Sequence, residues 1–240
     1  MAAATAPLPA TFYFAMAAAA KRRQKETDLE IAPEALPWQS LYKIMIGSIV
    51  PRPIGWISSV DSNGRHNLAP FSFFNAICAN PPSVLFCPMV RSTDGSHKDT
   101  LNNVRETGEF VVNIVSEFLA EAMNLTAGEY PADVDEFALA HLTPVPSVKV
   151  RPPRVGESLI HYECTLTQIV DLGDQPGAGS VVIGRVVHVH VADEVLIGAD
   201  KIDLAKLQPI GRLAGTSYAR VTDIFDLMRP PSQIANKQNS

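Results

Sequence analysis

The chain has 240 residues and a formal net charge of −5 at pH 7. With 46% apolar and 19% charged residues, global disorder is excluded, and the length suffices for one or two domains with a large core. The acidic balance, without a long basic run, disfavours nucleic acid as a partner, and no apolar stretch reaches the roughly 18 to 20 residues that span a bilayer. Three cysteines without a Cys-x-x-Cys motif fit a reducing compartment, so we expect a cytoplasmic protein.

The two ends of the chain differ in composition from the middle. Residues 1–40 are rich in alanine, then in charge, and then contain Pro33 and Pro37, so we expect a partly disordered N-terminal arm. An organelle transit peptide is an alternative interpretation of its first 20 residues, which precede Lys21-Arg22-Arg23. Residues 231–240 are polar and are expected to fray. Residues 41–230 are expected to form a single domain.

This middle part is predicted to consist mainly of strands. Residues 54–60 are apolar and β-branched, and Asn63-Gly64 is a hairpin turn signal that leads into a return strand at 66–72. Further strands are predicted at 83–89, 110–115, 159–170 and 180–191. Residues 110–115 are almost all apolar, which predicts burial on both faces of a sheet. The Gly- and Pro-rich residues 171–179 are expected to join the last two strands as a long hairpin.

Three helices are predicted, at about 97–107, 117–125 and 134–140. For the first, Ser96 is the expected N-cap and Gly108 the expected C-terminal stop. Many short strands with a few helices favour an antiparallel barrel. A doubly wound nucleotide fold is disfavoured because strands and helices do not alternate and no Gly-x-Gly-x-x-Gly motif is present.

The start of the first helix is a candidate phosphate site. The segment Ser96-His-Lys98-Asp99-Thr100 would combine unpaired backbone N–H groups, two hydroxyls and the Lys98 ammonium. The alternative is an ordinary capped surface helix whose Lys98 is simply solvated.

A second segment, Pro51-Arg52-Pro-Ile-Gly55-Trp56-Ile-Ser58-Ser, suits the wall of a site for a flat ligand. The guanidinium of Arg52 suits phosphate or an electron-rich carbonyl, Gly55 permits close approach to the backbone, and Trp56 could flank the ligand. The alternative is the start of a strand with a core Trp56 and a surface Arg52.

Two further segments complete the candidate set. Asn67-Leu68-Ala69-Pro-Phe-Ser72-Phe73-Phe74-Asn mixes amide, hydroxyl and aromatic groups, as a planar heterocycle with polar edges requires. In Pro209-Ile-Gly-Arg212-Leu-Ala-Gly-Thr-Ser-Tyr218, two glycines suggest a mobile loop from which Arg212 and Tyr218 could reach a site. The alternatives are a barrel strand with core phenylalanines and a C-terminal surface loop.

Taken together and in order, five segments resemble the flavin reductase-like, FMN-binding split-barrel family, in its branch similar to reductase components of two-component monooxygenases. They are Arg52-Pro-Ile-Gly-Trp-Ile-Ser58, Asn67-Leu-Ala-Pro-Phe-Ser-Phe-Phe74, Asn80-Pro-Pro82 leading into residues 83–86, Lys98-Asp-Thr100 and Glu109-Phe-Val-Val-Asn113. The resemblance covers about residues 41–230. It implies a mainly β, antiparallel Greek-key split barrel with a few short helices, and a homodimer with FMN near the subunit interface.

The resemblance also implies roles for individual residues. Arg52, Trp56 and Ser58 would lie along the flavin and its ribityl chain. Asn67, Leu68, Ala69 and Ser72 would contact the ring edge, with Phe73 and Phe74 beside them. The phosphate would be held at the segment of Ser96, Lys98, Asp99 and Thr100, and Arg212 and Tyr218 would approach the ring from the same or the partner subunit. Arg52, or a backbone N–H near Leu68 and Ala69, would stabilise the anionic reduced ring.

The leading functional expectation is an NAD(P)H-dependent flavin reductase, with NADH or NADPH as co-substrate and no obligatory catalytic side chain. The alternatives are a flavoredoxin-like FMN electron carrier without a nicotinamide site and a barrel that has lost flavin. A monooxygenase or another protein is the expected electron acceptor. His188-Val-His190 would place two imidazoles on one strand face, but no third ligand follows a clear pattern, so we interpret the pair as structural or solvent-facing.

Overall fold

The structure of the protein is a computed structural model that describes residues 30–232. These residues belong to two compact units. One unit contains the described segments 30–37, with the 3₁₀ turn η1 (Pro33–Ala35), and 223–232. The other is Trp38–Thr222 and holds every element discussed below. The expected arm at 1–29 and the end of the expected tail at 233–240 lie outside the described residues.

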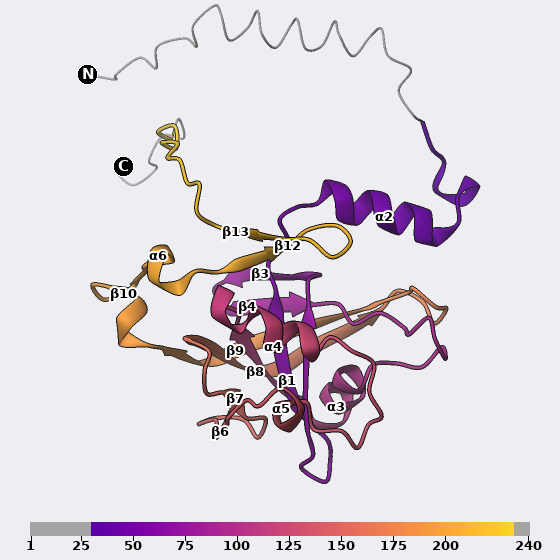
Figure 1. Ribbon diagram of the computed structural model, residues 1–240, viewed down its shortest axis with the longest axis horizontal. Coiled ribbons are helices and arrows are strands. Elements are labelled where there is room, and N and C mark those ends of the chain that lie inside the picture. Colours follow the sequence, from indigo (N-terminus) through magenta and orange to yellow (C-terminus); the bar gives the residue numbers. More distant parts are fainter. Residues whose placement is uncertain (1–29, 233–240) are drawn as a thin grey trace, which may run out of the picture. The chain divides into compact units, whose positions relative to one another are not determined.

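A seven-stranded antiparallel sheet, in the order β2-β1-β5-β8-β9-β4-β3, forms the centre of the larger unit (Figure 1). Its strands are β1 (Gly55–Val60), β2 (His66–Phe71), β3 (Phe74–Ala79), β4 (Pro82–Phe86), β5 (Glu109–Ile114), β8 (Ile160–Asp171) and β9 (Ser180–Val191). Three short pairs accompany it: β6 (Pro144–Val145) with β7 (Arg154–Val155), β10 (Leu196–Ile197) with β11 (Lys201–Ile202), and β12 (Ile210–Arg212) with β13 (Tyr218–Arg220). The predicted mainly β, antiparallel architecture is confirmed.

The helices of this unit are short. They are α2 (Trp38–Ser48), α3 (Asp99–Thr107), α4 (Ala120–Leu125), α5 (Glu136–Leu139) and α6 (Leu204–Leu207), with 3₁₀ turns η2 (Glu117–Leu119) and η3 (Asp193–Val195). Within residues 30–232, none of the helices is both long and apolar enough to cross a membrane.

The β1–β2 hairpin forms as its sequence predicts. Asp61 closes the turn, because its carboxylate accepts hydrogen bonds from the backbone N–H groups of Asn63 and Arg65 at 2.9 and 2.8 Å. Gly64 takes a φ of +81°, which an L side chain would resist. The register that follows pairs Gly55 with Phe71 and Val60 with His66.

The core lies on both sides of β1, whose six residues are all buried. Trp56 packs with Leu68, Met123 and Phe137 in one cluster, and its neighbour Ile57 packs with Phe86 and Phe110 in a second. Successive side chains of a strand point to opposite faces, so β1 divides the two clusters. Packing on both sides therefore fixes the position of β1. Side chains at the ends of β1 are held rigidly as a result.

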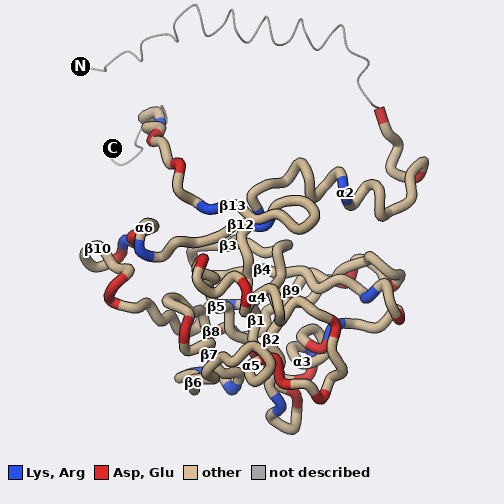
Figure 2. Tube along the Cα trace, in the orientation of Figure 1, with Lys and Arg blue, Asp and Glu red and all other residues tan. Residues whose placement is uncertain are grey.

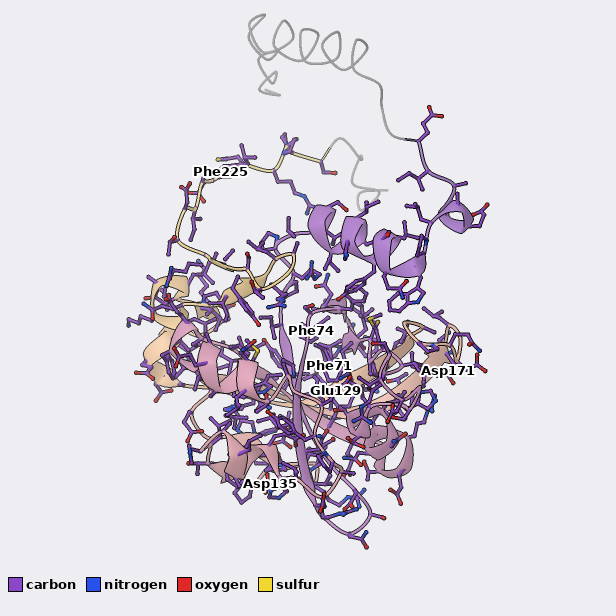
Figure 3. The ribbon with its side chains drawn as sticks, turned by 45° about the vertical axis from the view of Figure 1, so that its right-hand side comes forward. Phe71, Phe74, Glu129, Asp135, Asp171 and Phe225 are labelled. Carbon is purple, nitrogen blue, oxygen red and sulfur yellow. The ribbon has the colours of Figure 1, made fainter. Side chains whose placement is uncertain are left out.

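The long β8–β9 ribbon, orange in Figure 1, is the expected hairpin. Its far end is tied to α3, since Arg105 donates to Asp171 at 2.5 Å, and Asp171 lies at the edge of the molecule in Figure 3. The strand β3 and the helix α2 were not among the predicted elements. The predicted helix at 97–107 begins two residues late, at Asp99, and the one at 134–140 shortens to Glu136–Leu139.

Candidate ligand-binding site

One cavity of the larger unit has a volume of about 730 Å³, within the range of roughly 300–1,000 Å³ typical of small-molecule sites. We call it the main pocket. Helix α2 forms one wall with Trp38, Gln39, Tyr42, Lys43 and Ile46. The other walls come from Arg52, Ser72, Met89, Val90, Arg91, Ser92, Lys98, Glu129, Gly177, Arg212, Ala214 and Gly215.

The main pocket carries an excess of positive charge. Its charged lining residues are Lys43, Arg52, Arg91, Lys98 and Arg212 against the single acid Glu129. Figure 2 shows basic residues on α2 and beside β12 and β13, whereas acidic residues gather around α3 and α5. In a chain of net charge −5, this local reversal of sign favours an anionic ligand.

Arg52 connects three parts of the pocket wall. Its guanidinium donates to the carbonyl oxygens of Ile46 at 2.7 Å, Ile49 at 3.0 Å and Leu213 at 2.9 Å, and to Ser72 Oγ at 3.3 Å. Arg52 is only 5% exposed, and burial lowers the pKa of its guanidinium. Four of its five N–H groups are thus engaged. Arg52 holds the end of α2 and the 213–215 loop in place, and these four hydrogen bonds leave one of its N–H groups over within the described part of the chain.

The segment before α3 differs from the prediction. Asp94 accepts hydrogen bonds from both the N–H and the hydroxyl of Ser96, at 2.9 and 2.7 Å, so Ser96 belongs to a local turn. The N-cap position is Lys98, and no side chain caps the helix there. The expected N-cap role of Ser96 is therefore wrong. Gly108 ends the helix as predicted, with a φ of 72°.

Arg91 organises this same segment beside the pocket. Its guanidinium donates to Ser96 Oγ at 3.0 Å, to the carbonyl of His97 at 3.0 Å and to the Asp99 carboxylate at 2.6 Å. Its buried Nε has no hydrogen-bond partner among the described residues. The side chain of Asp99 is occupied by this ion pair, so Asp99 supports the pocket through Arg91.

Lys98 is the most available cation at this end of the pocket. Its ammonium lies 4.0 Å from Glu129 Oε1, and 28% of its side chain is exposed. Burial lowers the pKa of Lys98, and the attraction of Glu129 offsets this only in part. Glu129 itself accepts a hydrogen bond from Thr93 at 2.7 Å. An anion beside Lys98 would supply the close counter-charge that Glu129 provides only at a distance.

Several predicted site residues instead lie in the interior. Trp56 is fully buried and donates its indole N–H to Thr126 Oγ1 at 2.9 Å. Ser58 donates to the carbonyl of Pro153 at 2.5 Å and is also fully buried. These two side chains are held in β1 and do not line the main pocket, and their expected contact with a flavin stays a prediction. The alternation of β1 turns them into the core.

A buried polar network includes three further residues of the predicted site, Asn67, Leu68 and Thr100. Thr100 donates to Asn67 Oδ1 at 2.7 Å, and Asn67 donates to the Glu136 carboxylate at 3.1 and 3.2 Å. The backbone N–H of Leu68 donates to Glu136 Oε2 at 3.0 Å. Burial raises the pKa of Glu136, although these hydrogen bonds oppose the rise. These hydrogen bonds join Thr100, Asn67 and the Leu68 N–H to α5 and so support β2, while their expected contact with a flavin stays a prediction.

The aromatic residues of this segment separate. Phe74 lies against Gly55, where an added Cβ would come within 2.5 Å of the ring, and Figure 3 shows Phe71 and Phe74 inside the fold. Ala69 packs against the second core cluster. Phe73 lies beside α2, with its ring centroid 6.4 Å from that of Tyr42. Phe73 therefore has a ring contact with Tyr42, a residue that lines the main pocket.

Arg212 and Tyr218 are paired across β12 and β13. The guanidinium carbon of Arg212 lies 4.5 Å above the centre of the Tyr218 ring, and Tyr218 donates to Asn124 Oδ1 at 3.2 Å. They border a smaller hollow of about 210 Å³ that shares Tyr42, Ser72 and Arg212 with the main pocket. The two hollows are therefore neighbouring parts of one site.

The structure thus gathers Arg52, Ser72, Lys98, Arg212 and Tyr218 around one site, and it adds residues that the sequence interpretation missed. The main additions are Trp38, Tyr42 and Arg91. Trp38 was placed in the expected arm, since Pro33 and Pro37 precede it. The apolar residues Leu41, Tyr42, Met45 and Ile46 at helical spacing were a signal for α2.

The fold and the main pocket together define a mainly β, antiparallel protein with a pocket whose walls are aromatic and cationic. Residues 46–201 match the family described as the flavin reductase like domain. A protein of Halalkalibacterium halodurans is 39% identical over 204 residues, which is 84% of this chain and 97% of the relative. The chain belongs to the flavin reductase like domain family.

Solved structures agree with this assignment. Nitrilotriacetate monooxygenase component B from Bacillus cereus is 39% identical with a TM-score of 0.79, covering 85% of this chain and 100% of that one. A Shewanella frigidimarina protein with a split barrel domain has a TM-score of 0.72 at 23% identity, over 85% of this chain and 100% of that one. The predicted split-barrel fold and the predicted family are confirmed.

Proposed function

We propose that this protein is an NAD(P)H-dependent flavin reductase that binds FMN. The observation that carries the proposal is the main pocket: an aromatic wall on α2 faces a cationic lining in a chain of the flavin reductase like domain family. A flavin mononucleotide has the two features that such a site selects, a planar apolar ring and a dianionic phosphate. The pocket volume is adequate for a ligand of this kind.

The phosphate is assigned to the Lys98 end of the pocket. Lys98 and Arg91 bring positive charge there, and Ser92 adds a hydroxyl. The ring is assigned to the opposite part, where Ser72, Arg212 and Tyr218 adjoin. This arrangement retains Lys98, Ser72, Arg212 and Tyr218 from the site residues expected from the sequence. It also puts the positive charge of Arg52 near the ring.

FMN held in this pocket would supply the redox chemistry, which is hydride acceptance from reduced nicotinamide and onward electron transfer. The protein binds and orients the reactants and excludes water. Arg52, whose guanidinium is fixed by four hydrogen bonds, would place positive charge where the negative charge of a reduced flavin would develop. No side chain is needed to move a proton in this scheme, so none is assigned as a catalytic acid or base.

The proposal also covers the oligomeric state, the electron acceptor and the cellular compartment of the protein. A homodimer with FMN near its interface is proposed from the family resemblance. A monooxygenase is proposed as an electron acceptor, because a 39%-identical structure is a monooxygenase component B. The three cysteines are free thiols in the structure, which supports a cytoplasmic location.

An anaerobic spectrum tests the proposal. The purified full chain is loaded with FMN, separated from free flavin, and mixed with NADH or NADPH in the absence of oxygen. We expect the visible flavin absorption to bleach with at least one of the two nucleotides, far faster than for free FMN at equal concentration. A flavin-loaded protein that responds to neither nucleotide would contradict the reductase and favour the electron carrier.

A further inference from the structure

Four polar side chains face one another across the β8–β9 ladder. In the strand register, His161 lies opposite His190 and Glu163 lies opposite His188. Residues two apart on a strand share a face, so all four side chains lie on one face of the ribbon. None of them lines the main pocket, and the flavin site described above does not use them.

Three of these side chains converge closely enough to share one ion. Single ligand atoms of Glu163, His188 and His190 all lie within 4.8 Å of one another. His190 Nε2 is 2.6 Å from Glu163 Oε1, and the ring centroids of His188 and His190 are 4.7 Å apart. The sequence interpretation lacked a third ligand for the two histidines, and the neighbouring strand supplies it as Glu163.

Glu163 is fixed in position before any ligand arrives. The side chain is fully buried, and its carboxylate accepts hydrogen bonds from the backbone N–H groups of Val148 at 2.8 Å and Lys149 at 2.5 Å. The cluster therefore contains an anchored carboxylate beside two half-buried imidazoles.

We propose that Glu163, His188 and His190 bind one divalent transition-metal ion of the Zn²⁺ class. Two imidazoles and one carboxylate form a ligand set that Zn²⁺ accepts, with water in the fourth position. Metal–ligand bonds of about 2.0–2.2 Å at tetrahedral angles place ligand atoms roughly 3.3–3.5 Å apart. The contact between His190 and Glu163 must open by less than 1 Å, and the other separations, which are no more than 4.8 Å, must close by at most about 1.5 Å, which side-chain rotation provides.

His161 adds an independent sign of an incomplete polar site. Its Nε2 lies 2.8 Å from the carbonyl of Val155 and so carries the proton, which leaves Nδ1 as an acceptor. That Nδ1 is buried and has no hydrogen-bond partner among residues 30–232. The His161 ring lies against His190, with centroids 5.9 Å apart. A metal-bound water is a donor of the kind that this nitrogen lacks.

Metal titration tests the proposal without any flavin. The full chain, free of purification tags and stripped with EDTA, is prepared with Cys78→Ser to remove an exposed thiol that also binds Zn²⁺. We expect calorimetry to show one equivalent of Zn²⁺ bound per chain and Co²⁺ to give the visible bands of a four-coordinate site. Zn²⁺ should also raise the melting temperature.

His188→Gln is the decisive variant, because it removes one ligand while leaving the hydrogen bonds of Glu163 to His190, Val148 and Lys149. It should weaken Zn²⁺ binding by on the order of 100-fold or more. His66→Gln removes a half-buried histidine outside the cluster and should leave the affinity unchanged. A parent chain that takes up no Zn²⁺, or a His188→Gln chain that binds it as tightly as the parent, would overturn the proposal.

Discussion

Replacing Arg52 by methionine should release α2 and the 213–215 loop from the rest of the pocket. The variant keeps an apolar stem of similar length but loses four hydrogen bonds, three of them to backbone carbonyls at 2.7–3.0 Å. Hydrogen bonds from a charged donor contribute about 1.5–3 kcal/mol each, so three would sum to about 4.5–9 kcal/mol if they were independent.

The net effect is smaller for two physical reasons. The carbonyls of Ile49 and Leu213 are only partly buried and regain water, and the variant no longer has to bury a guanidinium. We therefore expect a loss of about 2–4 kcal/mol, or about 5–15 °C in melting temperature for a domain of this size.

Two assays check this prediction. Thermal unfolding measures the loss of stability, and hydrogen exchange should increase selectively in residues 38–50 and 213–217. Arg65→Met is the matched control, because Arg65 pairs with Asp61 on the exposed hairpin and should leave both measurements unchanged. An Arg52→Met chain with normal melting and normal protection of α2 would refute the structural role of Arg52.

The remaining predictions concern glycine packing and the phosphate. Gly55→Ala should destabilise the fold by about 1–3 kcal/mol in denaturant titration, since its Cβ would come within 2.5 Å of Phe74, whereas Gly47→Ala, with open space in α2, should stabilise by about 0.5–1 kcal/mol. Equal changes in stability for the two variants would contradict the close packing of Gly55 against Phe74. Lys98→Ala should weaken FMN binding by about 10–100-fold in fluorescence titration and riboflavin binding far less, whereas the exposed Lys201→Ala should change neither. Equal losses for both ligands would remove Lys98 from the phosphate site. Because burial lowers the pKa of free Lys98 and a bound phosphate would raise it again, FMN affinity should fall as pH rises through that lowered pKa, below the usual 10.5. A pH-independent ratio of FMN to riboflavin affinity in this range would contradict the assignment.

The strands could be predicted well wherever composition and turns agreed. The predicted strand at 180–191 matches β9 residue for residue, because a β-branched run follows directly on a Gly-rich turn. The predicted burial of residues 110–115 is borne out in β5, where Phe110, Val111 and Val112 are fully buried. In such segments local preference and tertiary environment agree.

In the two elements that the sequence did not predict, β3 and α2, local sequence preference and tertiary environment do not agree. Strand β3 has mostly exposed residues and lies at the edge of the sheet, so no alternation distinguishes it from a loop. Helix α2 begins at Trp38 directly after Pro37, and the prolines suggested an extended arm. Its place in the pocket wall is linked through Arg52, which donates to Ile46 and Ile49 nearby and to Leu213, a residue far away in the sequence.

The sequence indicated which segments approach the pocket but not which of their side chains line it. The four segments named from sequence do converge near the pocket, yet within β1 and β2 the sequence did not indicate which face looks outward. All six residues of β1 are buried, so Trp56 and Ser58 carry no polarity signal for their direction. Ser96 was a reasonable N-cap by type, but Asp94 two residues earlier competes for its hydroxyl and its N–H.

The most direct test of the central claim is equilibrium dialysis of the full chain against FMN and against riboflavin. The cationic pocket predicts retention of one FMN per chain, with riboflavin held far more weakly because it lacks the phosphate that Lys98 and Arg91 would bind. No retention of FMN, or equal retention of the two flavins, would contradict the proposed site.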